Sequence, residues 1–416
     1  MIPMPEVNYS APTTMFMLPP ELQELRDHTR AVVEKECFPL EAKFLSNQWA
    51  SPGTEFLGWG EGQVDGSLPA EDWKRLREVS EQAGLYAIGL PEELGGGGLG
   101  ILGDFVVACE TQRSVVPLPR AHVPLPLLKG TDDQKEQFLV PALEDKVLMA
   151  FAQSEPNAGS DPAAMTTTAR RTDDGWRIDG TKMWISGARQ ATHLLVLAVT
   201  DANKRARGGI TAFIVDAQAE GVSTTPIETW LTRHGHQYTV HLDAVHVPDD
   251  RVLGEVGGGF GLGQEFLQIQ DRLARASLAA GILSRGLDLA IDWAKNRVTF
   301  GKPIAERQAV QWMLVDAFLD LKSIRAMGYE TAARADAGED VRYLASASKF
   351  MGGNYGHRSI DKLMQVLGGM GETREQPFTT WYRQLRHGRI GGGTDEIQRM
   401  LIARALLEDG STIWHA

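Results

Sequence analysis

Apolar residues change their spacing twice along this chain, and these two changes constrain the fold more than any other feature of the sequence. From about residue 19 to 146 they recur at intervals of three and four, which is typical of amphipathic helices. The pattern then alternates between apolar and polar residues and is rich in Val, Ile and Thr, which predicts strands over 176–185, 193–200, 210–215 and 239–247. The helical period returns from 258 to 408, with interruptions at 301–303, 337–339 and 368–371.

The order of these regions is helical, then β, then helical. We therefore expect an α+β protein with an N-terminal helical domain over 1–146, a central β domain over 147–256 and a C-terminal helical domain over 257–416. The segment from Phe44 to Asp72 is rich in Gly, Ser and Trp and has no clear period, so it is interpreted as an exposed loop.

Composition excludes several classes of function. The formal charge of −12 argues against general affinity for nucleic acid or anionic membranes. Two cysteines cannot form a disulfide framework, and neither has the spacing of a metal ligand, so both are expected in the core. No arginine or lysine precedes Arg26, and no apolar run is long enough to span a bilayer. We expect a cytoplasmic protein with no metal site.

One glycine motif is set aside. Gly95, Gly97 and Gly100 satisfy the spacing GxGxxG of a dinucleotide-binding turn. The flanking regions are helical, ProGluGluLeu separates the glycines from the only candidate strand, and no second βα unit follows. An ordinary turn is the preferred interpretation.

Two segments carry groups suited to a planar cofactor. SerGluProAsnAlaGlySerAsp at 154–161 combines hydroxyl groups with free backbone N–H groups in one loop, which can bind a flavin edge or a pyrophosphate. LysMetTrpIleSerGly at 182–187 places an aromatic ring and a hydroxyl at a strand end. A tight turn and a buried core tryptophan are the alternatives for each segment taken alone.

Taken together, these segments resemble the acyl-CoA dehydrogenase family of flavoproteins. The resemblance runs from about Leu22 to Glu408, and it also rests on the segments ArgValThrPheGlyLysPro at 297–303, Gln308, GlnValLeuGlyGly at 365–369 and GlyThrAspGluIleGln at 393–398. It implies FAD between a β-barrel-like central domain and a C-terminal four-helix bundle. It also implies a homo-oligomer, a dimer or a tetramer, because several FAD contacts come from a neighbouring subunit.

The resemblance assigns individual residues by motif. The implied FAD-binding residues are Gln153, Ser154, Trp184, Ile185, Ser186, Arg297, Thr299, Phe300, Gln308, Gln365, Gly368, Gly369, Thr394 and Glu396. The implied substrate-binding residues are Ser160, Arg272, Gly392 and Gly393. The implied activity is α,β-dehydrogenation of an acyl-CoA to the 2-enoyl-CoA, as in fatty acid β-oxidation, with electrons passed to an electron-transfer flavoprotein.

The catalytic base is missing from its frequent position in this family. That reaction needs a carboxylate to remove the α-proton, and Gly392 stands where many members have a glutamate. In the isovaleryl and long-chain branches the base lies on the helix that opens the bundle, and ungapped alignment puts Asp271 there. We therefore expect Asp271 to be the base. The alternative is an ordinary helical pair with Arg275, four residues further on.

The small residues Gly391 and Gly392 also predict a wide acyl pocket, and the stretch 110–130 is shorter than the helices that usually line it. A branched, cyclic or long acyl group is expected.

Two other functions stay open: elimination from a 4-phospho-acyl-CoA without net redox change, as in the branch of the tenth and eleventh acyl-CoA dehydrogenases, and a partner subunit of a mixed oligomer.

Overall fold

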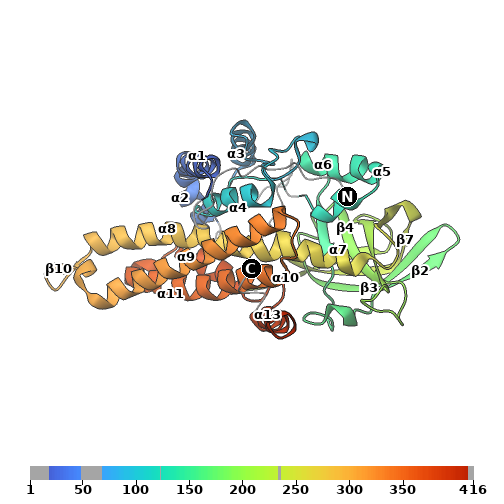
Figure 1. Ribbon diagram of the computed structural model, residues 1–416. Coiled ribbons are helices and arrows are strands. Elements are labelled where there is room, and N and C mark those ends of the chain that lie inside the picture. Colours follow the sequence, from blue (N-terminus) through green and yellow to red (C-terminus); the bar gives the residue numbers. More distant parts are fainter. Residues whose placement is uncertain (1–17, 48–67, 122, 233–235, 411–416) are drawn as a thin grey trace.

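The computed structural model describes residues 18–47, 68–121, 123–232 and 236–410. Helices, a sheet and helices follow one another along the chain, which confirms the predicted α+β fold class. In Figure 1 the sheet lies at one end of the molecule, the long helices of the C-terminal region extend away from it, and the N-terminal helices cover one side of both.

The N-terminal region consists of helices of different lengths joined by loops. They are α1 (Pro20–Glu36), α2 (Glu41–Asn47), α3 (Ala70–Gln82), α4 (Gly100–Thr111), α5 (Asp132–Gln134), a π-helical turn (Lys135–Leu139) and α6 (Val140–Leu143). Most of α4 is buried, which agrees with its apolar sequence, GlyIleLeuGlyAspPheValValAlaCys. Gly281 on a later helix allows close packing here, because a Cβ at this position would lie 2.5 Å from the carbonyl oxygen of Cys109.

The structure of this region tests two predictions from the sequence, the loop from Phe44 to Asp72 and the turn at the glycine motif. The expected loop from Phe44 to Asp72 is wrong at both ends, because Phe44 and Leu45 are buried in α2 and Asp72 belongs to α3. Apolar burial there outweighs the weak local periodicity, and residues 48–67 lie outside the described part of the chain. The turn at the glycine motif is confirmed, since Gly95 has φ +78° after a single helical turn at Glu92–Leu94 and the described residues 68–94 before it contain no strand.

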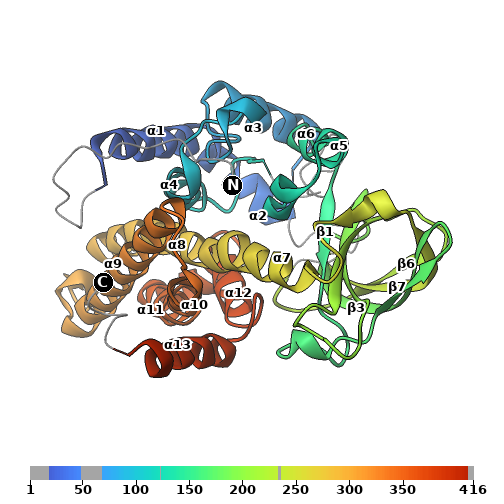
Figure 2. The same cartoon turned by 45° about the vertical axis from the view of Figure 1, so that its right-hand side comes forward.

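The central region forms one curved sheet. Its strands are β1 (Met149–Ala152), β2 (Thr168–Thr172), β3 (Gly175–Ser186), β4 (His193–Val199), β5 (Ile210–Asp216), β6 (Val222–Ile227), β7 (Gln237–Val247) and β8 (Val252–Leu253). They are ordered β6-β7-β3-β2-β4-β5-β8, and β1 pairs with β4 in parallel. Figure 2 shows that the sheet curves strongly on itself. The core inside it includes Trp176, Phe213 and Tyr238.

The C-terminal region is a helical bundle. Its elements are α7 (Gly259–Phe266), a π-helical turn (Leu267–Leu273), α8 (Ala274–Asn296), the hairpin β9 (Val298–Thr299) and β10 (Lys302–Pro303), α9 (Gln308–Asp336), α10 (Arg342–Phe350), a second π-helical turn (Met351–Tyr355), α11 (Gly356–Leu367), α12 (Phe378–Gly388) and α13 (Asp395–Asp409). Buried apolar residues of α8, α9 and α11 form one core with α4. Each fully buried Leu or Ile contributes about 1.5–3 kcal/mol to folding.

Both cysteines lie in this interior as expected, Cys37 at 0% and Cys109 at 1% exposure, and burial raises the pKa of each thiol to about 12. None of the described helices is both long and apolar enough to cross a membrane. Within the described ranges, no group of three or more His, Cys, Asp or Glu side chains could hold a metal ion.

Candidate active site

The loop after β1 is held against the sheet by a buried ion pair. Nζ of Lys182 on β3 donates to a carboxylate oxygen of Glu155 at 2.8 Å and to the carbonyl oxygen of Gln153 at 3.1 Å. Glu155 also accepts from the backbone N–H groups of Thr166 and Thr167. These bonds fix the backbone of Gln153 and Ser154, so the loop 154–161 begins in a rigid position.

Burial and pairing act in opposite directions on this pair. Burial alone would raise the pKa of Glu155, but Lys182 and the surrounding donors hold it at about 2. Burial lowers the pKa of Lys182 to about 8, and Glu155 opposes that shift. Because four donors converge on the carboxylate, we regard Glu155 as ionised at neutral pH.

The end of β3 presents an exposed aromatic ring beside this loop. The backbone N–H of Met183 donates to the carbonyl oxygen of Ser154 at 2.9 Å, so the two segments are neighbours. Trp184 is 51% exposed and has φ +64°, a conformation that non-glycine residues rarely adopt and that occurs often at functional sites. Ser186 is also exposed, whereas Ile185 is buried in the sheet core and can offer a ligand only its backbone.

Asp271 lies on the π-helical turn between α7 and α8. Its Oδ1 accepts from Nη2 of Arg275 at 2.7 Å, and its buried Oδ2 has no hydrogen-bond partner among the described residues. A Cβ added at Gly392 would overlap this Oδ2. The carboxylate of Asp271 therefore occupies the position from which a side chain at 392 would begin. π-Helical turns within α-helices are frequent at functional sites.

The glycine turn that faces Asp271 is held by side chains on both of its flanks. Nε2 of Gln398 donates to the carbonyl oxygens of Gly392 and Gly393, each at 3.0 Å. Nε of Arg389 donates to Asp395 at 2.7 Å, and the hydroxyl of Thr394 accepts from the N–H of Ile397 to cap α13. Gly392 and Gly393 have φ +70° and +90°, values that only glycine adopts without cost.

Basic side chains surround the carboxylate of Asp271. A Cβ at Gly391 would lie 3.3 Å from Nη2 of Arg275 and 3.1 Å from Nε2 of His387, so these side chains fill the space beside the turn. Burial, Arg275 and His236 lower the pKa of His387 to about 3, so the imidazole is neutral at pH 7. Burial also lowers the pKa of Lys349 to about 8; its Nζ lies 3.6 Å from a carboxylate oxygen of Asp395.

This arrangement corrects the expectation that Gly391 and Gly392 widen the acyl pocket, because Asp271, Arg275 and His387 occupy the space that the glycines leave. Sequence reasoning did not assign Arg275, His387 or Lys349 to the site. Their signal in the sequence is weak, since only a fold that joins the bundle helices brings them together.

Arg272 follows Asp271 on the same turn. It is 5% exposed, and its Nε is buried without a hydrogen-bond partner in the described structure. Burial lowers the pKa of its guanidinium. A buried, unsatisfied donor is costly, and a ligand oxygen would relieve that cost. Ser160, the other non-glycine residue expected at the substrate, is exposed on the loop after β1.

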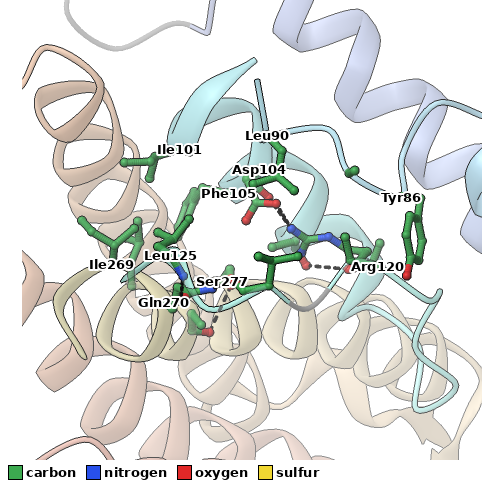
Figure 3. A pocket seen from close by; sticks show the side chains of 18 of the residues that line it. Tyr86, Leu90, Ile101, Asp104, Phe105, Arg120, Leu125, Ile269, Gln270 and Ser277 are labelled. Carbon is green, nitrogen blue, oxygen red and sulfur yellow. Dashed lines mark hydrogen bonds and ion pairs between the residues drawn. The ribbon is translucent and has the colours of Figure 1, made fainter. Parts of the chain in front are cut away.

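A cavity of about 290 Å³ lies beside the same turn, between α4, the segment 117–125 and the start of α8 (Figure 3). Gln270 connects its walls, because its side chain accepts from the N–H of Leu125 at 2.7 Å and donates to the carbonyl oxygen of Val123 at 2.6 Å. The described residues between α4 and Leu125 form no helix, and Pro117, Leu118, Pro119 and Arg120 among them form one side of the cavity.

The remaining residues expected at the cofactor lie elsewhere. Figures 1 and 2 show the β9–β10 hairpin at the end of the bundle opposite to the sheet. Ion pairs Arg358–Asp320 and Lys362–Asp316 show that α11 runs antiparallel to α9, so Gln365 lies towards the start of α9. Within one chain, the second group of residues expected at the cofactor therefore lies far from Trp184. This group consists of Arg297, Thr299, Phe300, Gln308, Gln365, Gly368 and Gly369.

Thr394 and Glu396 stand at the start of α13. Thr394 caps the helix, and the carboxylate of Glu396 is exposed beside it. The first turn of this helix thus carries both residues next to the glycine turn.

Models of one protein family match most of the chain. Family models match the acyl-CoA dehydrogenase N-terminal domain at 19–146, the middle domain at 150–245 and the C-terminal domain at 257–407. The chain belongs to the acyl-CoA dehydrogenase family. Members are flavin-dependent oxidoreductases, and the three-domain fold expected from the sequence is confirmed.

Relatives of this acyl-CoA dehydrogenase family member have different names. This chain is 34% identical over 401 residues to the short-chain specific acyl-CoA dehydrogenase of Bos taurus mitochondria, and the match covers 94% of this chain and 91% of the relative. It is 32% identical over 420 residues to (R)-benzylsuccinyl-CoA dehydrogenase of Thauera aromatica, covering 95% and 98%. The glutaryl-CoA complex of glutaryl-CoA dehydrogenase has 29% identity and a TM-score of 0.81, covering 94% and 96%.

The residues around Trp184 fit a flavin. The indole of Trp184 is exposed, and the buried Oε1 of Gln153, which has no hydrogen-bond partner among the described residues, faces Gly263 of α7. A planar ring with donor N–H groups would satisfy the amide oxygen and cover the indole.

Proposed function

We propose that this chain is an FAD-dependent acyl-CoA dehydrogenase that desaturates an acyl-CoA between its α and β carbons, with Asp271 as the base. The carrying observation is the buried, unpartnered Oδ2 of Asp271, which overlaps the position of a side chain at Gly392. An acceptor oxygen with no partner is ready to receive a proton.

The side chains around Asp271 support this role. Arg275 holds Oδ1 at 2.7 Å, which orients the carboxylate and leaves Oδ2 free to remove the α-proton. The neutral His387 does not compete as a second cation near the thioester. The bound thioester would also exclude water from the half-buried carboxylate, so that solvent does not compete for the proton transfer.

FAD, when bound, accepts the β-hydrogen as hydride. We infer that Gln153, Ser154, Trp184, Ser186 and the backbone of Ile185 hold its ring, with Thr394 and Glu396 near the rest of the molecule. Ser160 and Arg272 would bind the CoA portion, and the small Gly392 and Gly393 would let the thioester approach the base.

We infer that a second copy of the chain completes the cofactor site. The hairpin and the first half of α9 carry an exposed apolar surface of Val298, Phe300, Trp312, Val315, Phe318 and Leu319, and Phe300 is 97% exposed. An apolar surface of this kind marks an interface. Because it adjoins Arg297, Thr299 and Gln308, a partner seated there would bring these residues to the FAD of the other chain, as in a dimer or tetramer.

The acyl group is proposed to be branched, cyclic or long, since the cavity of about 290 Å³ beside Gln270 could hold such a group. The names of the relatives range from short-chain to benzylsuccinyl and glutaryl substrates, so they do not select among these groups. An electron-transfer flavoprotein is proposed as the acceptor of the electrons.

The test is anaerobic visible absorption of the purified protein during titration with short, long, branched and ring-bearing acyl-CoA thioesters. Bleaching of the flavin band by one class would support the proposal and identify the acyl group. Bound flavin that no thioester bleaches would contradict it. Protein without flavin that becomes active only with a second polypeptide would indicate a partner subunit instead.

A further inference from the structure

The cavity beside Gln270, which we propose holds the acyl group, has a polar side that a plain hydrocarbon chain would leave unsatisfied. Its walls include apolar side chains such as Phe105, Leu118 and Ile269, but also Asp104 and Arg120. Figure 3 shows Arg120 and Tyr86 on one side of the cavity, and Ile269 and Gln270 on the other. Because Gln270 directly precedes Asp271, the polar side lies across the cavity from the turn that carries the proposed base.

Arg120 has unused hydrogen-bonding capacity at this place. Its Nη2 pairs with Oδ1 of Asp104, while its Nε is buried and has no hydrogen-bond partner among the described residues. Nη2 also donates to the backbone carbonyl oxygen of Asp104 at 3.4 Å, but a guanidinium has five N–H donors, and these two oxygens do not satisfy them. The side chain of Arg120 is 20% exposed and that of Asp104 50%, so the arginine is the more enclosed member of the pair.

The segment that carries Arg120 is anchored on both sides. The N–H of Ala121 donates to the carbonyl oxygen of Tyr86 at 2.7 Å, and Gln270 binds the backbone of Val123 and Leu125. Asp104 is on α4, so the ion pair fixes the guanidinium against a helix. A donor held in this way is preorganised to bind an acceptor.

We propose that the acyl group of the substrate carries a hydrogen-bond-accepting oxygen at the end far from the thioester, and that Arg120 binds this oxygen while Asp104 orients the guanidinium. The inference rests on the proposed dehydrogenase function and narrows its substrate class to oxygen-bearing acyl groups. A carboxylate and a ketone share this chemistry, and the experiment separates them.

The experiment compares matched acyl-CoA thioesters on the flavin-loaded oligomer. One pair is oxocyclohexyl-propanoyl-CoA and cyclohexyl-propanoyl-CoA, and the other is adipoyl-CoA and heptanoyl-CoA. Each pair differs mainly in the oxygen function. We measure kcat/KM and, by calorimetry, the Kd of each thioester in wild type, Arg120→Met and a control, Arg170→Met, which removes an exposed arginine of β2.

The wild type is expected to prefer the oxygen-bearing member of at least one pair about tenfold to a hundredfold, the range expected for a hydrogen bond to a charged group. Arg120→Met should abolish this preference and change the apolar member less than threefold, while Arg170→Met keeps the preference. The pair that shows the preference identifies ketone or carboxylate.

Equal use of both members by the wild type, or a preference that survives in Arg120→Met, would overturn the inference. Should Arg120→Met not fold, Arg120→Gln replaces it and should weaken the preference. Failure of the proposed dehydrogenase function is a different result, because then no thioester of either pair bleaches the flavin of the wild type.

Discussion

Substitution of Gly392 by alanine tests the contact between the glycine turn and Asp271. The new Cβ would overlap Oδ2, so the carboxylate must move and its 2.7 Å bond to Arg275 must distort. At φ +70° a Cβ also costs about 1–2 kcal/mol of backbone strain. Displacement of a reacting group by about 1 Å can lower a rate about 100-fold. We therefore expect Gly392→Ala to lower the free energy of unfolding by about 1–2 kcal/mol. The rate of flavin reduction should fall about 100-fold.

The assay is stopped-flow flavin reduction by a saturating thioester, with denaturant titration for stability. Gly338→Ala is the matched control, because Gly338 has φ +76° in a turn and no atom lies within 4 Å of its added Cβ. The control should lose a similar amount of stability and reduce its flavin at the wild-type rate. Flavin reduction by Gly392→Ala within about threefold of the control would refute the reasoning.

Three further predictions concern the rest of the structure. Lys182→Met leaves Glu155 as an uncompensated buried charge and should cost about 3–5 kcal/mol in a denaturant titration. Adding Glu155→Gln removes that charge but keeps an acceptor oxygen for the backbone N–H groups of Thr166 and Thr167, so the double variant should recover part of the loss, and equal losses in the two variants would contradict this. His387 has its pKa lowered to about 3 from an ordinary 6.5, so the stability it contributes is complete above pH 6.5 and is lost as pH falls towards 3. Between pH 6 and pH 4 the free energy of unfolding should change less steeply with pH in His387→Phe than in the wild type, by up to about 1.4 kcal/mol per pH unit. An equal pH dependence in the two proteins would exclude this contribution of His387. Trp312→Glu with Phe318→Glu should dissociate the oligomer in sedimentation experiments and release FAD, and an intact flavin-loaded oligomer would argue against this interface.

The strands that the sequence predicted are long and have many buried side chains, and β4 and β5 are buried almost throughout. The predicted ranges 176–185, 193–200, 210–215 and 239–247 correspond to β3, β4, β5 and β7. Strands β2 and β6 were missed because they are largely exposed: β2 contains ThrAlaArgArgThr, and β6 contains Pro226. Their pairing with β3 and β7 supplies what their own sequences do not.

In the candidate site, too, residues within sequence motifs could be predicted, whereas residues brought together by the packing of distant helices could not. Asp271 and the glycine turn could be predicted because motifs fix their positions on the chain. The π-helical turn that carries Asp271 has no recognised sequence signal, and the side chains of Lys349 and His387 reach the turn only through the packing of the bundle. Sequence reasoning also treated Gly391 and Gly392 as empty space, since it could not show that Arg275 turns towards them.

The central claim is that Asp271 removes the α-proton, and flavin reduction in Asp271→Asn tests it most directly. The measurement is the FAD content and the anaerobic rate of flavin reduction by the best thioester, with Asp361→Asn, an exposed carboxylate of α11, as control. The account predicts normal FAD content and a rate at least about 1,000-fold below the control. Asp271→Asn that reduces its flavin at a near-normal rate would contradict the account and remove Asp271 from the mechanism.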